Sequence, residues 1–135
     1  MSADERAEPR WITEEILLAI HAQQIERYGG LHGVREEGVI LSALARPRNR
    51  WAYDRSADMA DLAASYLVGL TRTQGFNDGN KRSALACALV FLAVNGLALH
   101  VPPGELYALT MKASIGEADD AVVAACFRRQ LSPTR

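Results

Sequence analysis

The sequence is short of several features that mark specialised classes of protein. The chain has 15 Lys and Arg residues and 16 Asp and Glu residues, so its formal net charge is −1. It therefore lacks the excess of positive charge that would indicate binding to nucleic acid. The chain has only two cysteines, Cys87 and Cys126, which we interpret as free thiols in apolar segments. The three histidines, His21, His32 and His100, are not spaced as metal ligands, and we interpret them as surface or structural residues.

The chain also lacks a segment that would direct it out of the cell or into a membrane. Residues 1–10 are polar and charged, unlike a secretion signal. The longest apolar run follows Ser83 and is broken at Asn95 after about a dozen residues, whereas a bilayer span needs roughly 20. We therefore expect a cytoplasmic protein without a membrane partner.

What is present is ordinary for a globular domain. Hydrophobic residues make up 49% of the 135 and charged residues 23%. A chain of this length is expected to form one domain, residues 1–135, in which residues 1–9 are flexible.

Apolar periodicity and capping signals predict six helices and no sheet. The first begins after Thr13 and ends at Gly29. The others are expected over residues 35–45, ended by Pro47, then from Ser56 to about 71, and over 80–94, 104–114 and 119–131. The helix over 80–94 is apolar almost all round, which places it at the centre of an all-α bundle. Residues 97–101 are expected to be extended, and a short flap is possible at 46–53.

Residues 76–82, with the sequence FNDGNKR, are the most informative stretch of the chain. Lys81 and Arg82 fall in the first turn of an expected helix, where the helix dipole disfavours each cation by about 0.3–1 kcal/mol. A bound anion would remove this conflict, because free N–H groups, a glycine at position 79 and two cations together make a phosphate site. The alternative is a simple turn with an N-cap, in which both cations point into water.

These residues resemble the signature loop of the Fic/Doc family, written H-x-F-x-D/E-G-N-G-R. Lys81, where most Fic enzymes carry glycine, resembles the Doc (death on curing) branch, whose members are toxins of bacterial toxin–antitoxin pairs. Residues 28–38 and 42–47 resemble the N-terminal part of Doc-type proteins, and the similarity runs from about Ile16 to the last helix. The resemblance implies an all-α Fic/Doc helical bundle.

The resemblance also implies roles for the loop residues. Asp78 would hold Mg²⁺ on the phosphates of ATP, and Asn80 would donate hydrogen bonds to a phosphate oxygen. Lys81 and Arg82 would neutralise the charge that grows during transfer, and Gly79 would let the backbone wrap an anion. Helix capping is the alternative for Asp78 and Asn80, and solvated surface charge is the alternative for the two cations.

Other residues near the loop are weaker candidates. Arg72 is a possible contact to the nucleotide or the target, and a cation at the C-terminus of a helix is the equal alternative. Phe76 is expected to anchor the loop in the core. Asn77 has no predicted role, and Arg35 and Arg46 are expected to lie on a solvated face.

The chain departs from the family at its catalytic histidine, where it carries Gln74. In the family this histidine is the general base that takes the proton of the target hydroxyl. Glutamine has an acceptor oxygen but no useful basicity near neutral pH, so it can orient a hydroxyl without accepting its proton. The departure implies a site that binds nucleotide but is impaired in catalysis.

Two reactions are known in the family. Doc-type transfer moves the terminal phosphate of ATP to a threonine of elongation factor Tu, and Fic-type transfer moves a nucleotidyl (AMP) group to a protein hydroxyl. A module that binds nucleotide or antitoxin without catalysis is the third interpretation. The inhibitory pattern Ser/Thr-x-x-x-Glu-Gly/Asn of many Fic enzymes is absent, since Gly33 stands four residues before Glu37. Control is therefore expected from a separate antitoxin whose disordered tail folds into a groove of this domain.

Overall fold

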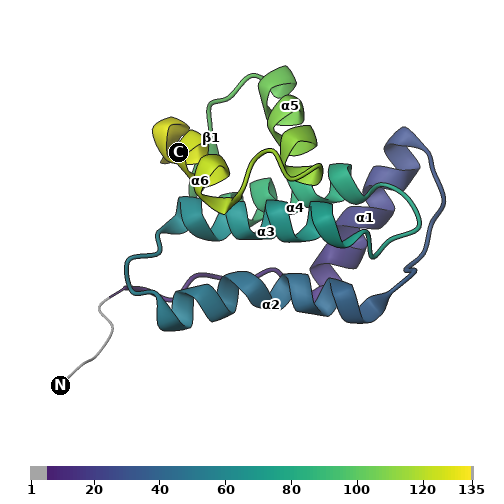
Figure 1. Ribbon diagram of the computed structural model, residues 1–135, viewed down its shortest axis with the longest axis horizontal. Coiled ribbons are helices and arrows are strands. Elements are labelled where there is room, and N and C mark those ends of the chain that lie inside the picture. Colours follow the sequence, from purple (N-terminus) through teal and green to yellow (C-terminus); the bar gives the residue numbers. More distant parts are fainter. Residues whose placement is uncertain (1–5, 135) are drawn as a thin grey trace.

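The computed structural model describes residues 6–134, which form six helices and a two-stranded sheet (Figure 1). The predicted all-α class is confirmed. No helix within the described residues is both long and apolar enough to cross a bilayer. The elements in chain order are α1 (Glu14–Tyr28), α2 (Glu37–Tyr53), α3 (Met59–Thr73), α4 (Asn80–Val94), β1 (Leu97–Leu99), α5 (Pro103–Ser114), α6 (Asp120–Gln130) and β2 (Leu131–Pro133).

The central helix of the bundle is α3, which packs against α2, α4, α5 and α6. Every residue from Leu62 to Thr71 is buried. The prediction that the helix over 80–94 occupies the centre was wrong, because several apolar side chains of α4 are only partly buried, namely Leu85, Ala86, Leu89 and Val90. Small residues let neighbouring helices approach α3 closely: a Cβ at Gly69 would lie 2.8 Å from a guanidinium nitrogen of Arg46.

The boundaries of α1 follow the local signals in the sequence. Thr13 caps the helix, and its Oγ1 accepts a hydrogen bond from the N–H of Ile16 at 3.2 Å. Ile12 and Leu17 are both buried, as expected for a hydrophobic staple across the N-cap. Gly29 ends the helix with a φ of 86°.

The helix α2 continues through Pro47, which was predicted to end it. Residues 46–53, predicted as a possible flap, are therefore helical. A proline inside a helix costs about 3 kcal/mol, so tertiary contacts must offset that cost. On one side of the proline, Arg46 donates to the carbonyl of Ser65 at 3.3 Å, and on the other side Trp51 packs against the core.

Ser56 was predicted to cap the N-terminus of α3. The residue that caps it is Asp58. The Asp58 carboxylate accepts from the N–H of Asp61 at 2.9 Å, and the Asp61 carboxylate accepts from the N–H of Asp58 at 2.9 Å. This reciprocal capping box outcompetes Ser56, whose hydroxyl donates instead to Asp54 at 2.6 Å.

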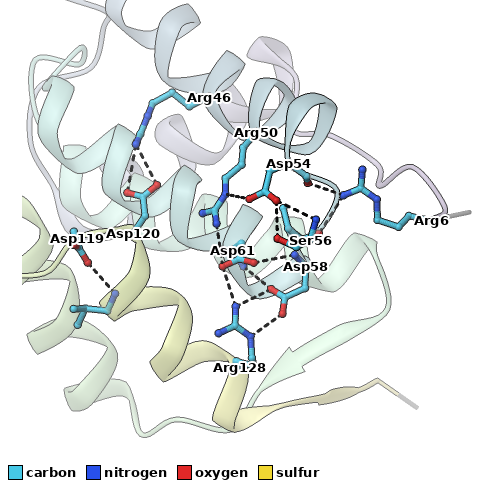
Figure 2. A network of polar contacts seen from close by, with 12 residues as sticks. Arg6, Arg46, Arg50, Asp54, Ser56, Asp58, Asp61, Asp119, Asp120 and Arg128 are labelled. Atoms are coloured by element: carbon cyan, nitrogen blue, oxygen red, sulfur yellow. Dashed lines mark hydrogen bonds and ion pairs between the residues drawn. The ribbon is translucent and has the colours of Figure 1, made fainter. Parts of the chain in front are cut away.

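Arg128 ties α6 to this cap, as Figure 2 shows. Its guanidinium lies 2.7 Å from Oδ2 of Asp58 and 2.9 Å from Oδ1 of Asp61. Burial raises the pKa of Asp58, but Arg128 and the N–H of Asp61 outweigh that effect and lower the pKa to about 2.

We expect Arg128→Gln to lower the free energy of unfolding by about 1 kcal/mol at neutral pH, because a half-exposed ion pair is strongly screened. The depressed pKa of Asp58 gives stability that is fully present above its ordinary value of 3.8 and is lost as the pH falls through about 2. Urea unfolding of both proteins should therefore show a difference at pH 7 that shrinks toward pH 2. The exposed neighbour Arg129, changed to Gln, is the control. A difference that stays constant with pH would contradict this account.

The strand β1, extended as predicted, pairs antiparallel with β2. Leu97 faces Pro133 and Leu99 faces Leu131 across the ladder. This small sheet was not predicted, because strands of three residues are too short for a pattern of period two to register.

The prediction of a flexible N-terminus falls partly on residues 1–5, which lie outside the described residues. Residues 6–9 make contacts with the rest of the fold. Arg6 donates to the carbonyls of Trp51 at 2.9 Å and Asp54 at 3.0 Å, and Pro9 is buried. This segment is packed against the C-terminal end of α2.

Candidate nucleotide site

The loop between α3 and α4 forms one wall of a pocket. The helix α3 ends at Thr73, and its C-cap Gln74 has the left-handed conformation with φ 49° and ψ 45°. The helix α4 begins after Gly79, which is also left-handed, with φ 75°. The pocket between this loop and α5 has a volume of about 440 Å³, within the range of small-molecule sites.

Most of the predicted site residues meet in this pocket, which is lined by Thr71, Gln74, Asn77, Asp78, Gly79, Asn80, Lys81, Arg82, Tyr107, Ser114 and Ile115. Arg72 is not among them. Its guanidinium donates to the carbonyls of Ala113 and Ala118, each at 3.1 Å. Arg72 therefore joins α3 to the segment around the end of α5, which favours the structural alternative over a contact to nucleotide.

The N-terminus of α4 has the properties of an anion site. Its first turn contains no acidic residue, and no side chain caps it. The first N–H groups of a helix have no partners within the helix. Lys81 is exposed, lines the pocket and makes no ion pair or hydrogen bond with another described residue. A bound anion would therefore meet both a free cation and free N–H groups.

Arg82 has a structural partner in addition to its place in the pocket. Its guanidinium donates to the carbonyl of Gly29 at 3.0 Å and to that of Gln24 at 3.5 Å, and it lies 5.5 Å from the ring centre of Tyr28. These groups belong to the C-terminal end of α1, where the helix dipole favours a cation. Arg82 therefore anchors α4 to α1, and its neutralisation of phosphate charge stays a prediction.

Asn80 closes the loop on itself. Its Oδ1 accepts from the N–H of Phe76 at 3.0 Å, and its Nδ2 donates to the carbonyl of Phe76 at 3.0 Å. Nδ2 carries a second N–H, so the predicted bond to phosphate is compatible with this closure. Phe76 is buried and stacks on His21 with ring centres 3.8 Å apart, which confirms its role as the core anchor of the loop.

Asp78 is held from two sides. Nε2 of His21 donates to its backbone carbonyl at 2.8 Å, and the N–H of Leu31 donates to its Oδ2 at 2.7 Å. Burial lowers the pKa of His21, so its ring is neutral near neutral pH.

The chemistry around Asp78 fits a magnesium ion in part. Oδ1 of Asp78 makes no hydrogen bond with the described residues. No group of three or more His, Cys, Asp and Glu within residues 6–134 is able to hold a metal. Mg²⁺ commonly binds through one or two carboxylates together with substrate phosphates and water, so Asp78 would hold it only together with such ligands.

Residues 29–36 clamp the loop from outside, and local sequence patterns did not predict this contact. The N–H of Asn77 donates to the carbonyl of Gly33 at 3.1 Å. The guanidinium of Arg35 donates to the carbonyl of Gln74 at 2.6 Å. Asn77, which had no predicted role, and Arg35, expected on a solvated face, therefore both position the site.

The opposite wall of the pocket is formed by α5, which was not connected with the site from sequence. Tyr107, Ser114 and Ile115 line it. Helical spacing places Tyr107 and Ser114 on one face of α5, and Ile115 follows directly as its C-cap, but only the fold shows that this face meets the loop.

Comparison with known proteins identifies relatives of this chain. Residues 11–92 match the Fic/DOC family. Protein kinase doc of Escherichia phage P1 is 42% identical over 120 residues, which cover 89% of this chain and 94% of that protein. Toxin Doc of Mycolicibacterium smegmatis is 40% identical over 73 residues, 53% of this chain and 56% of that protein. Because the family match spans more than half of the chain and the phage relative almost all of it, this chain belongs to the Fic/DOC family, in its Doc-type branch of toxins.

Proposed function

We propose that this chain is built to transfer the terminal phosphate of ATP to a hydroxyl of a translation factor, with elongation factor Tu as the expected target. The observation that carries the proposal is the convergence of Gln74, Asp78, Lys81 and Arg82 on one pocket at the N-terminus of α4. The phage relative is named a protein kinase, which supports phosphate transfer over nucleotidyl transfer.

In this reaction the hydroxyl oxygen of the target bonds to the γ-phosphorus, and the bond from that phosphorus to the bridging oxygen of ADP breaks. Lys81 and the first N–H groups of α4 would bind the phosphates and stabilise the charge that develops on them. Mg²⁺ held in part by Asp78 would supply further positive charge. The hydroxyl proton must pass to a base, and Gln74 stands at that position. Because glutamine does not accept the proton, transfer by this chain is expected to be slow.

Gln74 also favours a second function, that of a module that binds nucleotide or antitoxin without catalysis. Its amide can orient a hydroxyl, and the anion site at α4 does not depend on it. In both functions we expect control by an antitoxin whose disordered tail folds onto this domain. The two functions share nucleotide binding and differ in turnover.

Lys81→Ala tests the shared step. We expect Mg-ATP to bind the native chain and the substitution to weaken binding by about tenfold or more, since a hydrogen bond to a charged group contributes about 1.5–3 kcal/mol. Isothermal titration calorimetry gives both dissociation constants. Lys112→Ala is the matched control, because it removes the same charge from α5 without touching the pocket lining. If the native and Lys81→Ala proteins bind Mg-ATP with equal affinity, then the phosphates do not contact Lys81.

A further inference from the structure

His21 is a buried polar side chain that contacts the loop between α3 and α4. It lies on α1, is only 4% exposed and stacks on Phe76, with ring centres 3.8 Å apart and ring planes within 6° of each other. Its Nε2 lies 2.8 Å from the carbonyl oxygen of Asp78. A carbonyl oxygen only accepts, so Nε2 carries the hydrogen and donates it. This bond offsets part of the cost of burying a polar ring.

Packing alone does not require a histidine at this position. Stacking on Phe76 needs a flat ring, which a phenylalanine would supply without burying polar atoms. What the imidazole adds is a hydrogen-bond donor, and that donor reaches Asp78, which lines the pocket. His21 therefore serves the residue at position 78 as well as the core.

Asp78 is fixed at both its main chain and its side chain. His21 holds its carbonyl, and the N–H of Leu31 donates to its Oδ2 at 2.7 Å. The space around it is tight, since a Cβ at Gly30 would lie 3.1 Å from Cβ of Asp78. Oδ2 already accepts a hydrogen bond and Oδ1 makes none with the described residues, so Oδ1 is the oxygen best placed to bind a cation.

The C-terminal half of α1 also holds the start of α4, which packs against it (Figure 1). Arg82 donates to the carbonyl of Gly29 at 3.0 Å, and a Cβ at Gly79 would lie 3.1 Å from Cδ1 of Ile25. The helix α1 therefore fixes both Asp78 and the first turn of α4. It thereby sets the position of the carboxylate relative to the first N–H groups of α4.

We propose that His21 is a positioning residue for the metal end of the site, because its bond to the carbonyl of Asp78 sets where that carboxylate meets a magnesium ion on the phosphates of a nucleoside triphosphate. This role rests on the proposed function and adds a residue that acts on the ligand through Asp78. Partners that orient metal ligands typically change metal affinity by about 10–100-fold when they are removed. His21 is not among the residues that line the pocket, so its loss should spare nucleotide binding that does not depend on magnesium.

The test separates the magnesium-dependent part of ATP binding from the rest. Calorimetry on the full chain gives the dissociation constant of ATP with EDTA and with Mg²⁺, and the ratio of the first to the second measures the contribution of the metal. His21→Phe keeps a ring and loses the donor. We expect it to lower this ratio to within about twofold of the value for Asp78→Asn, and to leave the constant in EDTA within about twofold of the native value.

Two further variants identify the donor as the cause. His21→Gln loses the ring but keeps an N–H donor near the position of Nε2, so it should restore most of the ratio. His100→Phe makes the same substitution at an exposed histidine outside the pocket and should change neither constant. In the Asp78→Asn background, His21→Phe should have no further effect on the ratio, because the carboxylate through which it acts is gone. An equal effect in both backgrounds would overturn the inference.

The remaining outcomes overturn it in distinguishable ways. If His21→Phe keeps the native ratio, His21 does not position the carboxylate, while the proposed function stands. If affinity falls equally with Mg²⁺ and with EDTA, the histidine supports only the fold. If the native chain binds ATP no more tightly with Mg²⁺ than with EDTA, or in neither condition, the proposed function fails and this role fails with it.

A matched pair of amides replaces His21→Phe if that protein does not fold. The amide of His21→Asn is one methylene shorter than that of His21→Gln and does not reach the carbonyl of Asp78. His21→Asn should therefore lower the ratio where His21→Gln keeps it. Equal ratios for the two proteins would overturn the inference.

Discussion

Gln74→His is expected to switch on group transfer by this chain. A positioned general base contributes about 10²–10⁴-fold to such a rate. An imidazole with a pKa near 6.5 accepts a proton at neutral pH, whereas an amide does not. Induced expression of the Gln74→His protein should therefore arrest growth under conditions in which the native chain does not. The site needs no rebuilding, because position 74 already lines the pocket beside Lys81.

The rate is measured as modification of elongation factor Tu in the presence of Mg-ATP, followed by intact mass. Addition of a phosphoryl group supports the Doc-type reaction, and addition of a nucleotidyl group would assign the Fic-type reaction instead. The activity should also rise with pH through about 6.5, since only the neutral imidazole accepts the proton. A flat pH profile would mean that histidine does not act as the base.

Gln74→Asn is the matched control. Residue 74 is the one non-glycine residue with positive φ among residues 6–134. Both histidine and asparagine adopt the left-handed conformation more readily than most residues do. A gain in activity with both substitutions would therefore point to relief of the backbone and not to restored basicity. If neither substitution has an effect, the chain is a binding module.

The position of the loop over residues 76–82 at the start of a helix was predictable because its determinants are neighbours in the chain. Gly79, Asn80 and Lys81 are consecutive, and the conflict between cations and the helix dipole is visible without a structure. Their position at the start of α4 depends only on local helix geometry. The same holds for Thr13, whose capping role needs no tertiary contact.

What sequence could not supply are contacts between residues that lie far apart in the chain. The bond from Arg82 to the carbonyl of Gly29 spans 53 residues, and the bond from Leu31 to Asp78 spans 47. The prediction that Pro47 ends its helix failed for a related reason. Proline is a strong local signal for the end of a helix, but tertiary packing, which is present only in the folded chain, overrides that preference here. The place of Tyr107 in the pocket depends on how α5 packs, which its periodicity does not specify.

Gly75→Ala adds one methyl group, and we expect it to disturb the site more than the addition of a methyl group at any other position in the loop. A Cβ at position 75 would lie 2.4 Å from Cγ1 of Ile40 and 3.1 Å from Cγ2 of Val39. Ile40 is almost completely buried in α2, so it has little room to move. The carbonyl of Gly75 is also fixed, because it accepts from the N–H of Arg35 at 2.8 Å. We expect the free energy of unfolding to fall by about 1–3 kcal/mol, as for other overpacked sites.

Urea unfolding and ATP titration of the Gly75→Ala protein measure the two consequences separately. ATP affinity should fall as well, because the residue precedes Phe76 and any displacement of the loop moves the start of α4. Gly104→Ala is the control, since a Cβ there meets nothing within 4 Å and the position is helical. Alanine in a helix should be neutral or stabilising by up to about 1 kcal/mol. If Gly75→Ala changes neither the free energy of unfolding nor the ATP affinity, then α2 shifts readily to make room for the new methyl group.

A second substitution, Ile40→Ala, tests whether Gly75→Ala destabilises the protein through its contact with Ile40. Alone it should cost about 2–5 kcal/mol, as a large buried side chain replaced by a small one. Combined with Gly75→Ala it should cost less than the sum, because the new methyl group occupies space that the isoleucine has left. Additive costs would mean that Gly75 acts through its backbone conformation and not through close approach to α2. If the double variant also recovers ATP affinity relative to Gly75→Ala, then one packing contact between α2 and the loop controls both the stability of the fold and the geometry of the proposed nucleotide site.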